Sequence, residues 1–425
     1  VDPSIIDGMF FATTTPPYAE KLCAATMALA LHLRRDVQTA DVEGTPRSGT
    51  TAFEFALDAV KAGRAHNVLV AASDMRLAPP AGFTEQALGD GAGALLIGNK
   101  NVIAEVLGYY SISDELAATW RLDSDHYIRG WEDRFVMDES YSKVMPEAIS
   151  GLMKKCNLSA KDFAKAVFDP PGDIRRHGQV AAGLGFEANQ LLDPASVFLN
   201  AGLLGSAMSF VMLVSALEQA EPGQKILFAS YGNGADAFVL QTTDAIKEVG
   251  ARRGFAKHLA SKHLMERCND YIRWRELCTL DQARRPERGR ISISAVWRQR
   301  KDLLGLWGIK CRRCKTPQYD NGGITTTPIR VCAVCGAVDD FDDYDFSKKQ
   351  ATVFTYTHDL LAPASDPPSS AALIDFDDGG RMLFDLTDRD PDQIKVGTRV
   401  EMTFRKVYSD GRVNNYYWKA RPIRC

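Results

Sequence analysis

The residues whose type and spacing are best suited to chemistry are four cysteines in the C-terminal part of the chain. They form two CxxC pairs, Cys311 with Cys314 and Cys332 with Cys335, separated by a loop-like insert. A CxxC turn directs two thiols toward one point, so two such turns predict a tetrahedral thiolate site for one structural Zn²⁺ ion. Four protein ligands leave no open position for catalysis at the metal. The alternatives are two unrelated CxxC pairs, a redox dithiol and an iron site of the rubredoxin type.

Composition places the chain among ordinary globular proteins. Its 425 residues suffice for about two or three domains, with 45% hydrophobic residues, 25% charged residues and a net charge of −3. This balance argues against a general nucleic-acid binder, and no segment approaches the roughly 18–20 apolar residues of a membrane span. The nine cysteines are odd in number and mostly scattered. They indicate a reducing, cytoplasmic setting rather than a secreted disulfide framework.

Short apolar runs alternate with helical patterns over about the first 245 residues. The runs expected to be buried strands are Ile6–Ala12, Asn67–Ala72, Gly93–Ile97, Val102–Tyr109, Ala164–Phe168 and Lys225–Ser230. Helical spacing covers Tyr18–Leu33, Ser48–Ala62, Glu147–Lys155 and Ala201–Gln219. Such alternation predicts a layered α/β domain. The chain opens at Val1 without a methionine, so we expect part of the N-terminus to be missing.

The composition changes after this α/β part. The segment Ala251–Arg300 is rich in arginine, lysine and glutamate, which indicates helices with a solvated or docking face. Short strand signals follow at Ala351–Thr357, Ala371–Asp375, Arg381–Leu386, Arg399–Phe404 and Arg412–Lys419. Five short strands separated by turns predict a small OB-like barrel. The expected domains are an α/β domain at 1–248, a helical connector at 249–304, a zinc ribbon at 305–345 and the barrel at 346–425.

The segment from about Trp307 to Ile423 resembles the acyl-CoA-associated zinc-ribbon/OB-fold family. Besides the CxxC pairs, the match rests on Pro328–Gly336, Val353–Thr357 and Asp390–Gly397. Members of that family accompany thiolase-like enzymes, either as separate subunits or as fusions. The resemblance implies acyl-CoA as the ligand, and the sequence lacks the basic groove with interleaved aromatics that would favour nucleic acid.

The first 245 residues resemble the thiolase superfamily, closest to the 3-hydroxy-3-methylglutaryl-CoA (HMG-CoA) synthases. The match rests on Ala40–Thr50, Leu88–Ala94, Asn200–Gly202 and Ser230–Ala235. It implies α/β/α/β/α layers, a CoA thioester as substrate or ligand, and substrate contacts from Asn200, Gly232 and Gly234. It also implies a homodimer or a heteromer with a thiolase-like subunit. The family's first strand and helix have no counterpart in this chain.

The family's catalytic triad aligns with residues of other chemistry. The positions of its Glu, Cys and His correspond to Thr14, Pro46 and Asp169. A proline offers no nucleophile, so a Claisen condensation through an acyl-cysteine is not expected.

Two functions then fit the sequence equally well. One is aldol or retro-aldol chemistry on a CoA thioester, which needs a base and an oxyanion site but no cysteine. The other is a pseudoenzyme, a non-catalytic subunit of a thiolase-like complex. An authentic HMG-CoA synthase-like acyltransferase is the third alternative.

The candidate bases are Asp169, His177 and Tyr231, with Glu43 more remote. Their structural alternatives are a turn or capping aspartate, a surface histidine and a packed loop aromatic. Next to His177, Arg175 and Arg176 are suited to contact the phosphates of CoA.

Overall fold

The computed structural model describes residues 2–192, 194–251, 253–278, 291–319, 329–362, 364 and 366–424, with the backbone alone for 194–196 and 249–251. Pro328 and residues 279–290 of the expected connector lie outside the described residues. The chain divides into two compact units: unit 1 is Val1–Ala28 with Leu33–Lys262, and unit 2 is Leu29–His32 with His263–Cys425. No helix of the described part is long and apolar enough to cross a membrane.

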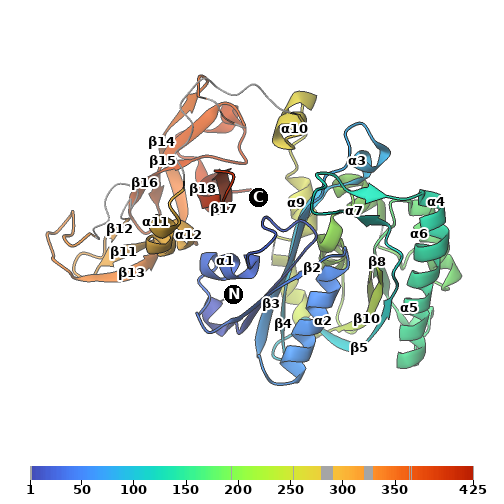
Figure 1. Cartoon of the computed structure of the whole chain (residues 1–425). Helices are drawn as coiled ribbons and strands as arrows, with labels where there is room; N and C mark the ends of the chain where they lie inside the picture. The colour runs from blue at the N-terminus through green and yellow to red at the C-terminus, as the bar shows by residue number, and fades with distance from the viewer. Residues whose placement is uncertain are drawn as a thin grey trace. The chain divides into compact units, whose positions relative to one another are not determined.

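Unit 1 contains two main sheets (Figure 1). The first has the order β2-β1-β3-β4 and consists of β1 (Gly8–Thr13), β2 (Gln38–Glu43), β3 (Asn67–Met75) and β4 (Asp90–Gly98). The second has the order β5-β10-β9-β8 and consists of β5 (Ala104–Ser113), β8 (Lys165–Phe168), β9 (Lys225–Tyr231) and β10 (Gly234–Thr242). A short ribbon pairs β6 (Thr119–Trp120) with β7 (Arg129–Gly130). The six predicted strands are confirmed, whereas β2, β6, β7 and β10 were not among them.

Helices α2 (Ser48–Lys61) and α8 (Met208–Leu217) form a layer between the two sheets. One core joins them to both sheets; its members include Phe10, Val70, Phe53, Phe210, Phe228 and Phe238. Met9 and Phe11 of β1 face the opposite way, toward α1 (Cys23–Ala30). Strand β1 is therefore buried on both faces, as its unbroken apolar run predicts.

The outer face of the second sheet is covered by α5 (Ser142–Cys156) and α6 (Ile174–Gly183). Together with α1, the first sheet, the α2–α8 layer and the second sheet, these helices complete an α/β/α/β/α sandwich. The remaining elements of unit 1 are η1 (Pro3–Ile5), α3 (Phe83–Ala87), α4 (Asp133–Val136), the π-helical η2 (Met137–Tyr141), η3 (Ala160–Asp162), α7 (Pro194–Ala201), η4 (Gly205–Ala207), η5 (Asp244–Ala251) and α9 (Phe255–Ala260).

The prediction of one continuous helix over Ala201–Gln219 was wrong. Helix α7 ends at Ala201, the short η4 follows, and α8 begins at Met208. Gly202 and Gly205 have φ values of +77° and +59°, which an α-helix cannot accommodate. The helix expected over Tyr18–Leu33 is likewise shorter, because only α1 within it is helical.

Unit 2 contains a small ribbon sheet, a barrel and short helices. The ribbon has the order β12-β11-β13 and consists of β11 (Trp307–Cys311), β12 (Pro317–Gln318) and β13 (Phe341–Asp345). The barrel has the order β16-β15-β14-β17-β18 and consists of β14 (Gln350–Asp359), β15 (Ser369–Phe376), β16 (Arg381–Asp385), β17 (Arg399–Ser409) and β18 (Asn414–Pro422). The helices are α10 (Cys268–Trp274), α11 (Ile293–Arg298) and α12 (Arg300–Gly305), and η6 (Pro391–Gln393) precedes β17. The five predicted barrel strands are confirmed.

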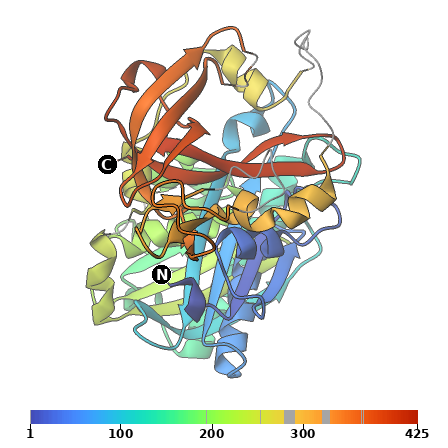
Figure 2. The ribbon, with the colours of Figure 1, turned by 90° about the vertical axis from the view of Figure 1, so that its left-hand side faces the viewer.

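The barrel closes as an OB fold does. Strands β14, β15 and β16 form an antiparallel meander, and β17 pairs with β14. The long β17–β18 hairpin, drawn in red in Figure 2, then returns to β16 through a parallel bridge between Leu386 and Ala420. Closure removes the free strand edges and encloses an aromatic core around Phe346 and Phe376.

Candidate functional site

A cavity of about 680 Å³ lies in unit 1 at the carboxyl ends of several strands. Arg76 follows β3, Asp169 follows β8, Tyr231 ends β9, and all three residues line the cavity. Helix α4, the start of α6 and η4 contribute further lining residues. Ligands of α/β folds bind at the carboxyl ends of strands, in pockets of about this size. This cavity is therefore the candidate functional site.

Asp169 is held against the cavity wall by the neighbouring strand. Because β8 and β9 are parallel and Phe168 is in register with Ala229, Asp169 comes next to Ser230. Its Oδ2 atom accepts hydrogen bonds from Ser230 Oγ at 2.6 Å and from the Tyr231 amide at 3.2 Å. Its Oδ1 atom is buried and has no hydrogen-bond partner within the part of the chain that is described.

The environment of Asp169 suits proton transfer near neutral pH. Burial raises the pKa of Asp169 to about 7, and this outweighs the hydrogen bonds from Ser230 and Tyr231, which lower it. A general acid or base works best when its pKa lies close to the working pH. Asp169 is therefore a buried carboxyl group that can both give and take a proton.

His177 is buried in α6, not on the surface, and is absent from the described residues that line the cavity. Its Nδ1 atom lies 3.1 Å from the Tyr141 hydroxyl, which donates to the Asp169 carbonyl oxygen at 2.9 Å. Its ring packs on Phe168 with a centroid distance of 4.2 Å. Burial lowers the pKa of His177 to about 4, so the imidazole is neutral at pH 7. Through Phe168 and Tyr141, the His177 side chain therefore supports the backbone at Asp169 without lining the cavity.

Tyr231 lines the cavity, but its hydroxyl is engaged elsewhere. It donates to Ser140 Oγ at 2.7 Å, and Ser140 in turn donates to the Leu116 carbonyl oxygen at 3.3 Å. Burial raises the pKa of Tyr231 above its usual value of 10, so the phenol stays protonated. Tyr231 thus offers the site a fixed aromatic wall rather than a base.

Of the other residues singled out from the sequence, only some lie at the cavity. Pro46 and Gly232 line the cavity, whereas Thr14, Asn200 and Gly234 are absent from its described lining. The Thr14 amide donates to Asp74 Oδ1 at 2.6 Å, and its buried hydroxyl has no described hydrogen-bond partner. The exposed Asn200 accepts a hydrogen bond from Lys262 at 3.2 Å. A Cβ atom on Gly234 would lie 1.9 Å from the Ile112 carbonyl oxygen, so this glycine permits close packing.

Sequence reasoning missed two charged residues at the end of β3. Asp74 is buried and accepts hydrogen bonds from Thr13, Thr14, Thr15 and Ser206, which ties the loop after β1 to η4. Arg76 lines the cavity with only 7% of its surface exposed. The signal was the sequence Asp74-Met75-Arg76 at the end of an apolar strand, where charged side chains meet the site.

The four CxxC cysteines converge in unit 2. Their sulfur atoms all lie within 4.8 Å of one another, with 3.7 Å between Cys311 and Cys335 and 3.5 Å between Cys314 and Cys332. A tetrahedral Zn²⁺ site with bonds of about 2.3 Å places its sulfur ligands about 3.8 Å apart. Backbone amides of Cys335 and Val334 help lower the pKa of Cys332 to about 6, which favours the thiolate form. The donor set and spacing fit a zinc ion.

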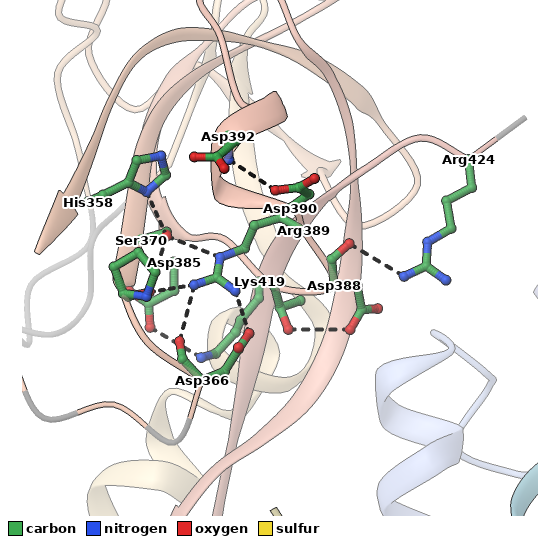
Figure 3. Close-up of polar contacts among 12 residues, drawn as sticks. His358, Asp366, Ser370, Asp385, Asp388, Arg389, Asp390, Asp392, Lys419 and Arg424 are labelled. Carbon is green, nitrogen blue, oxygen red and sulfur yellow. Dashed lines mark hydrogen bonds and ion pairs between the residues drawn. The ribbon is translucent and has the colours of Figure 1, made fainter. Parts of the chain in front are cut away.

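A second polar cluster lies in the barrel and is structural (Figure 3). The Arg389 side chain is 2% exposed and forms an ion pair with Asp366. It also donates to Ser370 Oγ at 3.0 Å and to the carbonyl oxygen of Pro368, and Ser370 in turn lies 2.8 Å from Nδ1 of His358. These contacts fasten the segment before β15 to the barrel, and they account for the buried charge of Arg389 without a ligand.

Comparison with known proteins separates the two parts of the chain. The family described as the C-terminal OB-fold domain of ChsH2 matches residues 344–405. A crystal structure of HMG-CoA synthase complexed with CoA has the same fold as the α/β part, with a TM-score of 0.52 and 21% identity. That match covers 58% of this chain and 67% of the other.

Curated relatives have a higher sequence identity to this chain than that solved structure. The hydroxymethylglutaryl-CoA synthase of Methanopyrus kandleri is 35% identical over 252 residues, which cover 59% of this chain and 71% of the relative. That of Methanothermobacter thermautotrophicus is 32% identical over 273 residues, covering 64% and 77%. Identity at this level, over more than two thirds of the relatives, shows that the chain belongs to the hydroxymethylglutaryl-CoA synthase family and carries an OB-fold domain in its C-terminal part.

Proposed function

We propose that this protein makes or breaks a carbon–carbon bond in a CoA thioester without a cysteine nucleophile, in an aldol or retro-aldol reaction. The observation that supports this most directly is Asp169, a buried carboxyl group on the cavity wall whose pKa of about 7 suits acid–base work. The relatives are named for a CoA thioester, which suggests the ligand class.

The proposal includes the substitution of the family's catalytic triad. Thr14, Pro46 and Asp169 would stand in place of its Glu, Cys and His. Pro46 lines the cavity, and the described lining residues include no cysteine. A bound thioester therefore meets no thiol that could accept its acyl group, whereas a base remains available.

In the retro-aldol direction, the Asp169 carboxylate accepts the hydroxyl proton of a 3-hydroxyacyl-CoA. The electron pair of the O–H bond forms a carbonyl group, the Cα–Cβ bond breaks, and its electrons form the enolate of a shortened thioester. The proton on Asp169 then passes to the enolate carbon. The products are an acyl-CoA and an aldehyde or ketone, and the aldol direction is the reverse.

Two further parts of the proposal concern bound groups. Arg175 and Arg176, which line the cavity with 93% and 29% of their side chains exposed, would contact the phosphates of CoA. The four cysteines of unit 2 would hold one structural zinc ion. We also propose that the protein acts in the cytoplasm as a homodimer or with a thiolase-like subunit.

A non-catalytic subunit is the second candidate. It is favoured by Pro46 on the cavity wall and by His177, which is neutral, buried and hydrogen-bonded away from the cavity. An authentic HMG-CoA synthase-like acyltransferase is the third alternative and requires an acyl-cysteine.

The deciding experiment incubates the protein with a series of 3-hydroxyacyl-CoA thioesters. Chromatography detects the shortened acyl-CoA, and a hydrazine reagent traps the carbonyl product. We expect turnover by the wild type and a loss of about 10²–10⁴-fold in kcat for Asp169→Asn, because the amide cannot accept the proton. Asp58→Asn, the same chemical change on an exposed position of α2 outside the described lining, is the matched control.

Parallel incubation with acetyl-CoA, followed by mass spectrometry, separates the alternatives. An acetyl group on a cysteine would support the acyltransferase and contradict the triad substitution. No turnover in either assay, together with a co-purifying thiolase-like protein, would support the non-catalytic subunit. Turnover that is unaffected by Asp169→Asn would reject Asp169 as the base.

A further inference from the structure

Tyr141 contacts all three candidate bases without lining the cavity. It ends the π-helical η2 and is fully buried. Its hydroxyl donates to the Asp169 carbonyl oxygen at 2.9 Å and lies 3.1 Å from Nδ1 of His177. Its ring packs edge-on against Tyr231, with 5.2 Å between the ring centroids. One buried side chain thus contacts the backbone of the proposed base, the histidine next to it and the aromatic wall of the cavity.

The π-helical turn η2 is what brings Tyr141 to this place. Such turns are rare and occur frequently at functional sites. Met137 at the start of η2 lines the cavity, whereas Ser140 accepts a hydrogen bond from the Tyr231 hydroxyl at 2.7 Å. Ser140 and Tyr141 are adjacent in sequence and both fully buried. Two consecutive side chains of η2 therefore fasten the segment after β8 and the end of β9.

The hydrogen bonds around the Tyr141 hydroxyl have one direction that satisfies every group. A tyrosine hydroxyl has a single hydrogen, and a buried backbone carbonyl group needs a donor. Among the described residues, no donor other than Tyr141 reaches the Asp169 carbonyl oxygen. When the hydroxyl gives its hydrogen to Asp169, its oxygen accepts from His177, so Nδ1 must carry a proton. Because the pKa of His177 is lowered to about 4, the ring is neutral at pH 7 and its proton is on Nδ1 alone.

We propose that Tyr141 is a positioning residue for Asp169, and that the Nδ1-protonated form of His177 orients the Tyr141 hydroxyl. This hydroxyl holds the Asp169 carbonyl oxygen, while Ser230 and the Tyr231 amide hold Oδ2 of its carboxyl group. Asp169 is thus fixed through its backbone and its side chain, which leaves Oδ1 in one orientation. The inference rests on the proposed function in taking Asp169 as the base. A reacting group misplaced by about 1 Å can cost about 10²-fold in rate.

The test is Tyr141→Phe, which removes the hydroxyl and keeps the ring. The Tyr231 amide donates to Asp169 Oδ2, so its hydrogen exchange, followed by NMR, reports the position of the carboxyl group without any turnover. We expect this amide to exchange about tenfold faster in Tyr141→Phe, as the loss of one hydrogen bond implies. We also expect kcat to fall about 10–100-fold while KM stays within about twofold, because the cavity lining is unchanged.

Tyr110→Phe is the matched control. It makes the same chemical change at a tyrosine that packs against the same hydrophobic core but lies outside the described lining of the cavity. It should leave both the exchange of the Tyr231 amide and kcat as they are in the wild type. Equal changes in Tyr110→Phe and Tyr141→Phe would show a general loosening of this core and overturn the inference.

The tautomer of His177 gives a second test, made on the wild type. Histidine-selective ¹⁵N labelling distinguishes a protonated from an unprotonated ring nitrogen, and the His177 signals are assigned by their absence from His177→Gln. We expect the proton on Nδ1, and a proton on Nε2 would overturn the inference. A normal kcat in Tyr141→Phe, while Asp169→Asn is impaired, would overturn this inference alone. A normal kcat in both variants would overturn the proposed base as well.

Discussion

Asp169 and His177 are both buried, and burial shifts their pKa values in opposite directions. The carboxyl group rises to about 7 and the imidazole falls to about 4, because a low-dielectric environment disfavours whichever form is charged. At pH 7 His177 is neutral, while Asp169 exists in both forms. The acid–base capacity of the site therefore lies in the aspartate, and the histidine acts through packing and its contact with Tyr141.

Asp169→Asn should change how stability depends on pH. Between pH 4 and about 7 the folded wild type holds a proton on Asp169 that the unfolded chain releases, so stability falls as pH rises through this range. Asparagine does not titrate, so the unfolding free energy of the variant lacks this dependence on pH. Urea unfolding at pH 5 and pH 8 should show the variant gaining about 2 kcal/mol relative to the wild type at the higher pH.

The comparison between the two proteins isolates Asp169 from His177. The lowered pKa of His177 makes the folded state lose stability as pH falls from about 6.5 toward 4, but this term is present in both proteins and cancels in their difference. Unfolding free energies that run parallel from pH 5 to pH 8 would contradict the raised pKa of Asp169.

For single residues, the sequence is a better guide to the position of a polar group in the fold than to its chemical role. Asp169 directly follows an apolar run that had to be a strand, and in the structure it comes directly after β8. The pKa of Asp169 depends on its burial by segments that are distant in sequence, and a local sequence pattern contains no information about that burial. Arg76 was overlooked for the same reason, since an arginine after a strand normally lies in solvent.

At the scale of elements, periodicity predicted most of the long strands and some of the helices, but not the turns around the cavity. The short barrel strands were predictable because turn residues separate them. The segment Ala201–Gln219 read as one helix because its residues are small and apolar, whereas Gly202 and Gly205 break it in the structure. That break lets η4 approach Asp74 and places Gly205 in the cavity wall.

Gly205→Ala should therefore destabilise unit 1. Its φ of +59° is strained for alanine, and a Cβ atom would lie 2.1 Å from Asp74 Oδ2. We expect a loss of about 3 kcal/mol or more in the free energy of unfolding, measured in urea. Gly63→Ala is a matched control, because Gly63 has a φ of +70° but a Cβ atom added there would meet no other atom within 4 Å.

Gly63→Ala should lose only the cost of placing alanine in a left-handed backbone conformation, about 1 kcal/mol in the free energy of unfolding. The difference between the two variants then measures the contact between η4 and the Asp74 carboxylate. Equal losses in both variants would show that this contact does not hold the loops around the cavity.

At the scale of the whole molecule, the chain joins two units with different sources of stability. Unit 1 has extensive cores on both faces of its sheets. In unit 2, the described residues of the ribbon around the cysteines form only a small hydrophobic cluster, which consists largely of the cysteines themselves. A segment of that size is rarely stable without a metal or a disulfide. The CxxC spacing predicted from the sequence that the four cysteines converge, and the structure brings their sulfur atoms within 4.8 Å of one another.

Removal of the proposed zinc ion should therefore loosen the barrel as well as the ribbon. Leu306 precedes β11, Tyr344 lies in β13 and Phe346 follows it, and all three belong to the same core as the barrel residues. The ring centroids of Phe346 and Phe376 are 4.9 Å apart. Without metal, the four cysteine side chains lose the ion that would hold them together, β11 and β13 are no longer fixed at that end, and the aromatic packing next to them weakens.

Hydrogen exchange followed by mass spectrometry, before and after treatment with a strong chelator, measures this effect region by region. We expect faster exchange in β11, β13 and the barrel strands β14 and β15, and the same change in Cys332→Ser without chelator. Cys268→Ser, at an exposed cysteine of α10 outside the four-cysteine cluster, should exchange like the wild type. If elemental analysis shows that zinc has left while exchange in the barrel is unchanged, the metal does not support the OB fold. If only the ribbon loosens, Phe346 and its neighbours hold the barrel without it.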